Sequence, residues 1–215
     1  MNYKRASGLL LHPTSLPGPD GMGDLGPNAY AWVDFLEQSG THLWQVLPLG
    51  PTGFGDSPYQ CFSAFAGNPY LISFSLLMDQ GLLKRSDLID RPEFSDHRVE
   101  FGQVIPWKLK VLKRAFTNFQ RKKSEILKKR FFDFRQAENW WLDDFTLFMA
   151  IKEDQGGISW NNWPLPLRSR DKNAIEGFRR AHQQLIETQA FWQFLFFDQW
   201  SALKRYCASK HVQVI

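Results

Sequence analysis

Apolar residues in the first fifty positions alternate with segments rich in glycine and proline. Residues 7–11 (SGLLL) predict a short strand, and residues 12–26 predict a loop. Pro27 indicates the start of a helix, because a proline at the first helical position gives up no hydrogen bond. Apolar side chains then recur at helical spacing until Gly40, which is typical of a helix end, and residues 43–49 predict a second strand.

Strand, loop, helix and strand in this order predict a βαβ unit with parallel strands. The hydrophobicity of both strands is continuous rather than alternating, so we expect a sheet that is covered on both faces. The loops that follow the two strands then lie at one edge of the sheet, where α/β folds bind their ligands. The second of these loops, residues 50–72, is therefore the first candidate binding segment.

Residues 76–187 lose this rhythm and predict a helical insertion. Apolar side chains at steps of three and four residues predict an amphipathic helix around residues 109–119 and another over residues 139–152. Asp171 is a candidate N-cap of a third helix. The segment is too long for an ordinary loop, so we expect a subdomain.

The earlier pattern returns near the end of the chain. Residues 188–210 predict a helix that is apolar on most sides, and residues 211–215 begin a third strand. A three-stranded sheet whose last strand is cut short leaves apolar faces and edges open, which indicates a piece of a larger protein. The expected parts are the first strands, helix and substrate loop (1–75), the insertion (76–187) and the return to the sheet (188–215).

The composition adds an unusual aromatic content. The chain of 215 residues is 43% hydrophobic and 22% charged, as globular proteins are, but 15% aromatic, with 19 Phe and 9 Trp. No apolar run approaches the about 18 residues that span a bilayer, and the N-terminal apolar segment is too short for a signal peptide. Cys61 and Cys207 match no metal or redox spacing. We therefore expect a cytoplasmic protein without a membrane partner.

The net charge of +4 is unevenly distributed. Between Val104 and Arg135 there are eleven Lys and Arg residues against two acidic ones. Such a helix could contact nucleic acid, or it could expose a solvated face. The solvated face is favoured because charge runs are usually exposed, so nucleic acid is not an expected partner.

The titratable residues offer no clear catalytic group. The five histidines lack metal-ligand spacing, and neither a phosphate loop nor a nucleophile elbow is present. Paired carboxylates at 143–144 and 153–154 fall on or after a predicted surface helix. His12 is the only titratable group at the end of the first strand, and a lone histidine favours a structural role. We expect no metal site.

The loop around Gly53–Gln60 (GFGDSPYQ) has the composition of a sugar site. Sugars present apolar C–H faces and a rim of hydroxyls, so their sites need aromatic rings beside short polar side chains. The flanking glycines let the backbone approach a ligand closely. The same rings could equally pin a long loop to the sheet, and composition leaves the two interpretations even. The candidate binding residues are Phe54, Asp56, Ser57, Tyr59 and Gln60.

Three longer stretches, residues 7–26, 44–72 and 160–171, closely resemble the 4-α-glucanotransferases, or amylomaltases, of glycoside hydrolase family 77. The resemblance covers the whole chain and is densest in the first 75 residues. It implies an α/β fold, the N-terminal part of a (β/α)8 TIM barrel with a helical subdomain inserted after the second strand. It also implies transfer of an α-1,4-glucan segment by a retaining double displacement, in which closely spaced carboxylates act as nucleophile and acid/base, without any cofactor.

The resemblance assigns this chain substrate binding rather than catalysis. The family's nucleophile, acid/base and third carboxylate lie on later strands, so no Asp or Glu here is a catalytic candidate and the chain alone is expected to be inactive. Tyr59 matches a tyrosine beside the scissile sugar, Ser57 matches a polar contact to the donor, and Phe54 stands where many members have tyrosine. With Asp56, these are the expected site residues. The expected partners are α-1,4-glucans, maltooligosaccharides and glucose.

Two alternative functions stay open on the sequence. One is a related α-glucan hydrolase, which would release mostly glucose from maltotriose rather than longer oligosaccharides. The other is a nucleic-acid-binding protein that uses the basic helix around residues 121–130, whose binding to RNA would be sensitive to salt.

Overall fold

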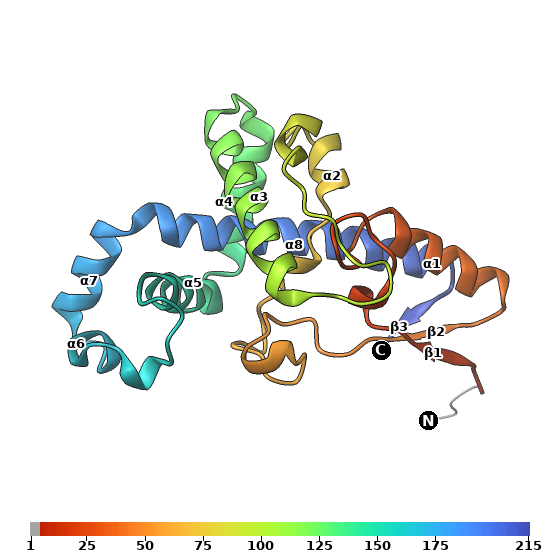
Figure 1. Cartoon of the computed structure of the whole chain (residues 1–215), viewed down its shortest axis with the longest axis horizontal. Coiled ribbons are helices and arrows are strands. Elements are labelled where there is room, and N and C mark those ends of the chain that lie inside the picture. Colours follow the sequence, from red (N-terminus) through yellow and green to blue (C-terminus); the bar gives the residue numbers. More distant parts are fainter. Residues whose placement is uncertain (1–4) are drawn as a thin grey trace. The chain divides into compact units, whose positions relative to one another are not determined.

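A computed structural model describes residues 5–215 and shows a three-stranded sheet together with helices of very different lengths (Figure 1). β1 is Gly8–Leu10, β2 is Leu43–Gln45 and β3 is Gln213–Val214. The strands are ordered β1-β2-β3, and both pairings are parallel. The predicted α/β fold with a parallel sheet is therefore confirmed, and β2 lies at its centre.

The central strand is shorter than the apolar run that predicts it. Leu43 lies opposite Gln213 of β3, and the backbone N–H of Val46 still donates to the carbonyl of the residue that follows β3, at 2.9 Å. Pro48 has no N–H to donate, so the ladder cannot continue through it. The predicted strand 43–49 therefore ends in an extended segment that leads into the candidate loop.

The expectation that the sheet is covered on both faces is wrong for β1. All three of its residues are exposed, with Leu9 at 41% and Leu10 at 56% of their full accessible surface. A sheet of three strands lacks the neighbours that would cover its edge strand. Trp44 of β2, in contrast, is fully buried, and its Nε1 donates to the carbonyl of Leu11 at 2.8 Å.

Helix α1, Pro27–Gln38, makes the crossover from β1 to β2. It begins at Pro27 as predicted, after Gly26 as N-cap. Gly40 follows the helix with a left-handed φ of 68°, which a glycine adopts without steric cost. The buried face consists of Ala29, Val33 and Leu36.

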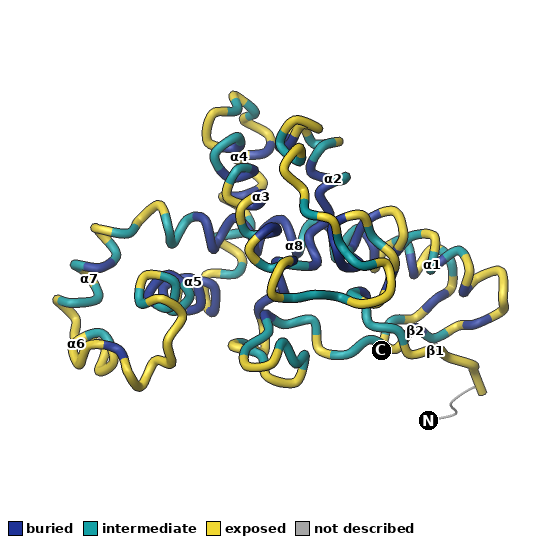
Figure 2. Tube along the Cα trace, in the orientation of Figure 1, coloured by how far each residue is buried: buried dark blue, intermediate teal, exposed yellow. Residues whose placement is uncertain are grey.

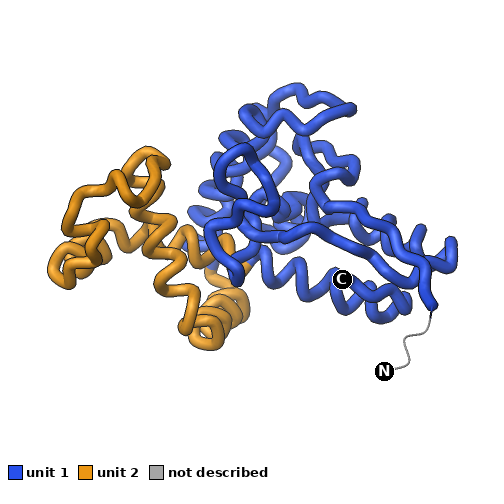
Figure 3. Tube along the Cα trace, turned by 90° about the horizontal axis from the view of Figure 1, so that it is seen from below, with its two compact units in different colours: residues 1–122, 195–215 blue, residues 123–194 orange. Residues whose placement is uncertain are grey.

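The chain divides into two compact units (Figure 3). Unit one comprises Met1–Lys122 and Leu195–Ile215, and unit two comprises Lys123–Phe194. Helix α8, Gln183–Ser209, contributes residues to both units. The division at residues 75 and 187 stays a prediction.

Unit one carries two further α-helices, α2 (Phe74–Asp79) and α3 (Phe101–Arg121). A pair of hydrogen bonds joins the start of α2 to the C-terminal half of α8. Gln199 accepts from the backbone N–H of Ser73 at 2.8 Å and donates to its carbonyl at 3.1 Å. Short 3-10 helices occupy Pro13–Ser15, Phe54–Asp56, Pro69–Leu71 and Arg85–Leu88.

Unit two is helical, with α4 (Glu125–Ala137), α5 (Asn139–Asp154), α6 (Leu165–Arg168), α7 (Lys172–Ala181) and the first part of α8. A 3-10 turn covers Trp160–Asn162. The predicted cap of α7 is confirmed, because Asp171 accepts from the backbone N–H of Ala174 at 2.9 Å. Figure 2 shows the buried side of α5, which packs into a core of Leu147, Ala150, Ile151, Trp163 and Phe178. Among the described residues, no helix is long and apolar enough to cross a membrane.

The basic segment forms two helices. α3 ends at Arg121 and α4 begins at Glu125, after Ser124, whose hydroxyl accepts from the N–H of Leu127 at 3.4 Å. Most of its cations lie on exposed or half-buried positions. Lys108 is the exception, since it is fully buried within α3.

Lys108 lies in an apolar environment with a few polar neighbours. Its Nζ is 3.5 Å from the carbonyl of Ile72 and 4.8 Å from the centroid of the Phe74 ring. Burial lowers the pKa of Lys108, and the charges of Asp24 and Asp20 oppose that shift. Burial also raises the pKa of Asp20, and the charge of Lys108 opposes this rise. The lysine therefore compensates part of the desolvation of an aspartate in the loop after β1.

Replacement of Lys108 should change the pKa of Asp20. In Lys108→Met the pKa of Asp20 should rise further, because the compensating charge is lost. Because the pKa of Asp20 is raised in the folded state, its contribution to the free energy of unfolding is lost as the pH rises through that pKa. In the variant this loss should therefore extend to higher pH. Carboxyl NMR titration and urea unfolding at several pH values measure both effects. Lys113→Met, an exposed change on the same helix, is the control. An unchanged Asp20 titration in Lys108→Met would contradict the coupling.

Candidate functional site

A cavity of about 480 Å³ lies beside the segment that follows β2. One wall is the end of the strand region, Pro48 to Gly50, and another is the stretch from Pro58 to Gly67. The third wall comes from α8, through Phe196, Phe197 and Trp200. All of these residues belong to unit one. The cavity thus lies at the C-terminal edge of the sheet, where the parallel topology predicts a ligand site.

The candidate loop folds back on itself beside this cavity. Thr52 and Cys61 form an antiparallel bridge, and the N–H of Gly53 donates to the carbonyl of Gln60 at 2.8 Å. At the tip, Gly55 and Asp56 both adopt positive φ angles, of 68° and 53°. These two left-handed residues reverse the chain and project the segment between the bridge partners outward.

The aromatic rings of the projecting segment are exposed. Phe54 is 88% exposed and Tyr59 is 72% exposed. Rings with this much accessible surface contribute little to pinning a loop to the protein. Their exposure favours the interpretation that they are platforms for a ligand over the interpretation that they are anchors.

The predicted site residues do not all meet at the cavity. Tyr59 lines it, whereas Phe54, Asp56 and Ser57 lie outside its lining. Ser57 has a local role, because its Oγ accepts from the backbone N–H of Tyr59 at 3.3 Å. A serine turn of this kind orients the backbone that carries the tyrosine. Gln60 uses its carbonyl in the backbone bond that closes the loop.

Sequence reasoning missed the wall that α8 provides. Phe196 and Trp200 are four residues apart and therefore lie on one side of the helix. That spacing was visible, but it predicted only packing. Gly67 brings the loop against this helix, since a Cβ on Gly67 would lie 1.9 Å from Cδ1 of Phe196. The nearby N–H of Asn68 donates to the carbonyl of Leu49 at 2.7 Å, which ties the loop to the segment after β2.

His12 has the structural role that its isolation favours. It caps the 3-10 turn Pro13–Ser15, with Nδ1 2.8 Å from Oγ1 of Thr14 and 3.3 Å from the Thr14 backbone nitrogen. Burial lowers the pKa of His12, against an opposing effect of the Pro48 carbonyl. The imidazole is thereby kept neutral at pH 7, as a cap that accepts a hydrogen bond must be.

The side chains that line the cavity suit the binding of a ligand. Its lining within the described chain contains no Asp or Glu, and its polar side-chain groups are the hydroxyls of Tyr59 and Ser63, the thiol of Cys61 and the indole N–H of Trp200. Among residues 5–215, no three His, Cys, Asp or Glu side chains converge to hold a metal ion. Aromatic faces beside hydroxyl groups suit a neutral polyhydroxylated ligand.

Comparisons with known proteins identify the relatives of this chain. The 4-alpha-glucanotransferase family model matches residues 11–215. The chain is 49% identical over 215 residues to the 4-alpha-glucanotransferase of Thermus thermophilus, covering 100% of this chain and 42% of that protein. It is 38% identical over 221 residues to the chloroplastic/amyloplastic 4-alpha-glucanotransferase of Solanum tuberosum, covering 100% of this chain and 38% of that protein. The chain thus spans less than half the length of these relatives.

A solved structure shares the fold of this chain. The amylomaltase from Streptococcus agalactiae in complex with acarbose superposes with a TM-score of 0.93 at 39% identity, over 98% of this chain and 42% of that one. The amylomaltase from Corynebacterium glutamicum, at 20% identity and a TM-score of 0.74 over 95% of this chain and 29% of that one, shares the fold.

The contact between the loop and α8 predicts the effect of one added methyl group. Gly67→Ala should destabilise the chain by about 1–3 kcal/mol, because Phe196 or the loop must move to admit the Cβ. Urea unfolding measures the loss. Gly102→Ala is the matched control in the same unit, where a Cβ would meet nothing within 4 Å. Equal stability of the two variants would show that the close approach at Gly67 is absent.

Proposed function

Because the chain belongs to the 4-alpha-glucanotransferase family, we propose that it is a substrate-binding part of an enzyme that transfers a segment of an α-1,4-glucan. The acceptor is the 4-hydroxyl of another glucan or of glucose. One observation carries the proposal: an aromatic-walled cavity with Tyr59 on its rim follows β2 in a chain that matches the family from residue 11 to residue 215.

The proposed binding mode follows from the walls of the cavity. Its volume of about 480 Å³ falls within the about 300–1,000 Å³ typical of ligand sites. Tyr59 offers a ring face and a hydroxyl to the donor glucan, and Trp200 offers an apolar face on the opposite element. Ser57 holds the Tyr59 backbone, as its hydrogen bond indicates. Phe54 lies outside the cavity, and we propose that it and Asp56 contact a longer glucan beyond it.

The proposed reaction retains the configuration at the anomeric carbon. A carboxylate attacks C1 of the donor, the C1–O4 bond breaks, and a carboxylic acid gives its proton to the departing oxygen. The 4-hydroxyl of the acceptor then attacks C1, the bond between C1 and the carboxylate breaks, and the hydroxyl proton passes to the same acid/base group. The family resemblance assigns these carboxylates to later strands, so the part of this chain is to hold the sugar and to keep water from the bond.

We also propose that the sheet is part of a (β/α)8 barrel with unit two as an inserted subdomain. The parallel order β1-β2-β3 with helical crossovers supports a barrel. The exposed Leu9 and Leu10 of β1 support it too, because a neighbouring strand or helix would cover them. Unit two lies within the crossover from β2 to β3, which supports an insertion after the second strand.

Removal of the Tyr59 ring tests the binding mode. Tyr59→Ala should weaken maltoheptaose binding about tenfold, or about 1.4 kcal/mol, because stacking area and a hydroxyl are lost together. Isothermal titration calorimetry measures the change. Phe35→Ala, at a 51% exposed aromatic residue of α1 outside the cavity, is the control. Equal affinities for both variants would remove Tyr59 from the site.

The chain of 215 residues should not convert maltotriose into glucose and longer oligosaccharides. The reason is the lack of carboxylates around the cavity in the described residues, since retaining transfer needs two of them close together. Chromatography of the products after long incubation checks this outcome. Turnover that persists after Tyr59→Ala and Gly67→Ala would point to a contaminant, whereas turnover that falls in Tyr59→Ala would refute the prediction.

A further inference from the structure

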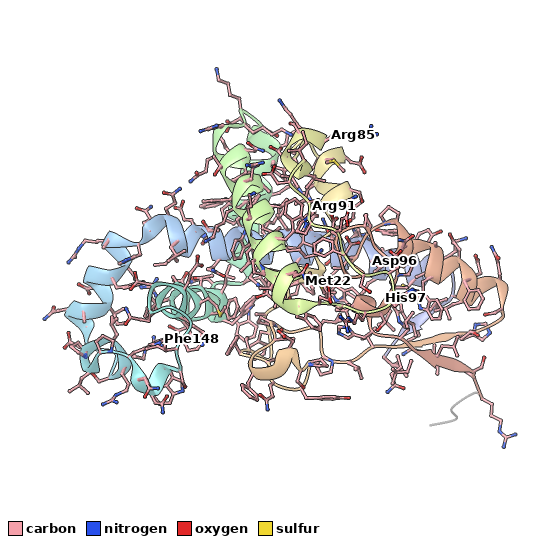
Figure 4. All side chains as sticks on the ribbon, in the orientation of Figure 1. Met22, Arg85, Arg91, Asp96, His97 and Phe148 are labelled. Atoms are coloured by element: carbon pink, nitrogen blue, oxygen red, sulfur yellow. The ribbon has the colours of Figure 1, made fainter. Side chains whose placement is uncertain are left out.

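Unit two contains a pocket of its own, of about 270 Å³. It is formed by the stretch 160–171 together with α5 and α7, and Phe148 on α5, labelled in Figure 4, lines it. The stretch 160–171 is one of the three that resemble the family, and the proposed function gives it no role.

The floor of this pocket is part of a packed core. Trp163 is 6% exposed and Ile151 is 2% exposed, and both belong to the core of unit two. The rings of Phe148 and Trp163 lie with their centroids 5.2 Å apart. A pocket that rests on core residues keeps its shape without a ligand, so binding costs little reorganisation.

Trp160 forms an exposed aromatic wall above this floor. It is 54% exposed, although it lines the pocket. The carbonyl of Trp160 accepts from the N–H of Trp163 at 3.1 Å, so the 3-10 turn ties the exposed indole to the buried one. A large indole held at the edge of a pocket offers a flat face for stacking.

Two arginines supply hydrogen-bond donors at the same pocket. Arg168 donates to the carbonyl of Asn161 at 2.8 Å, and Arg170 donates to Asp144 at 2.6 Å. A guanidinium has five N–H groups, and among the described residues each arginine makes one side-chain hydrogen bond. Both guanidinium groups are exposed, so their remaining N–H groups are open to solvent or to a ligand at the edge of the pocket. Asp144 offsets the charge of Arg170, so this guanidinium suits a neutral hydroxyl better than an anion.

We infer that this pocket is a second carbohydrate site, which holds one neutral pyranose ring of an α-glucan between Trp160 and the two arginines. The inference rests on the proposed function for the identity of the sugar. An aliphatic ligand would contact the apolar floor but could not use the arginine N–H groups at the edge, whereas the hydroxyls of a sugar can accept from them. The volume of about 270 Å³ is just below the about 300–1,000 Å³ of typical ligand sites, so it suits a single ring.

Fluorine NMR of the whole chain labelled with 5-fluorotryptophan tests the inference. The nine tryptophan signals are assigned with single Trp→Phe variants. Trp160 and Trp163 report on the pocket of unit two, and Trp200 reports on the cavity after β2. Trp140, which is 67% exposed on α5 and lies outside both linings, is the internal control. Maltoheptaose is titrated in, and decanoate is the apolar comparison.

Maltoheptaose should shift the Trp160 and Trp163 signals in a saturable manner and leave Trp140 unchanged. Trp160→Ala, followed at Trp163, and Arg168→Gln should each weaken this response at least about fivefold. Movement of Trp200 alone would overturn the inference and leave the proposed function intact. Movement of Trp160 and Trp163 without Trp200 would support the inference and contradict the proposed cavity. A response to decanoate but not to maltoheptaose, or no response at all, would overturn the inference.

Discussion

Parallel pairing of β2 with both neighbours is the constraint on which the rest of unit one depends. Parallel strands cannot be joined by a tight turn, so each connection must cross the sheet and return. α1 makes the first crossover, and the chain from the candidate loop to α8 makes the second. Because all three strands run the same way, the segments after β1 and β2 emerge at one edge. The cavity exists at that edge because a helix from the second crossover closes it.

The sequence predicted those helix ends that depend on residues close by in the chain. Pro27 begins α1 and Asp171 caps α7, since each acts through its own backbone or that of residues close by. The break between α3 and α4 was missed, because the apolar spacing and the charge run continue on both sides of Ser124. The burial of Lys108 was missed for a related reason: a run of cations predicts a solvated face and cannot indicate which member turns inward.

The candidate site shows the same limit. Tyr59 could be singled out because a loop after an apolar strand is a reasonable place for a ligand. The opposite wall, Phe196 and Trp200, could not, because it meets the loop only through the tertiary fold. The close contact at Gly67 belongs to the same class, since the sequence shows a glycine but not the ring that lies against it. The sequence therefore identified the residues on the projecting loop, but not the residues of α8 that close the cavity on the opposite side.

The placement of unit two within the second crossover has a consequence for divergence within the family. All three walls of the cavity belong to unit one, while the intervening Lys123–Phe194 packs around a separate core. Changes of length in the turns of that segment that line no pocket leave the wall geometry unaltered, provided that α8 still places Phe196 against Gly67. Relatives of this kind would differ in the length and surface of unit two while keeping the same cavity walls in unit one. The fold thus separates the turns of unit two, whose length can change, from the loop and α8 contacts that shape the cavity of unit one.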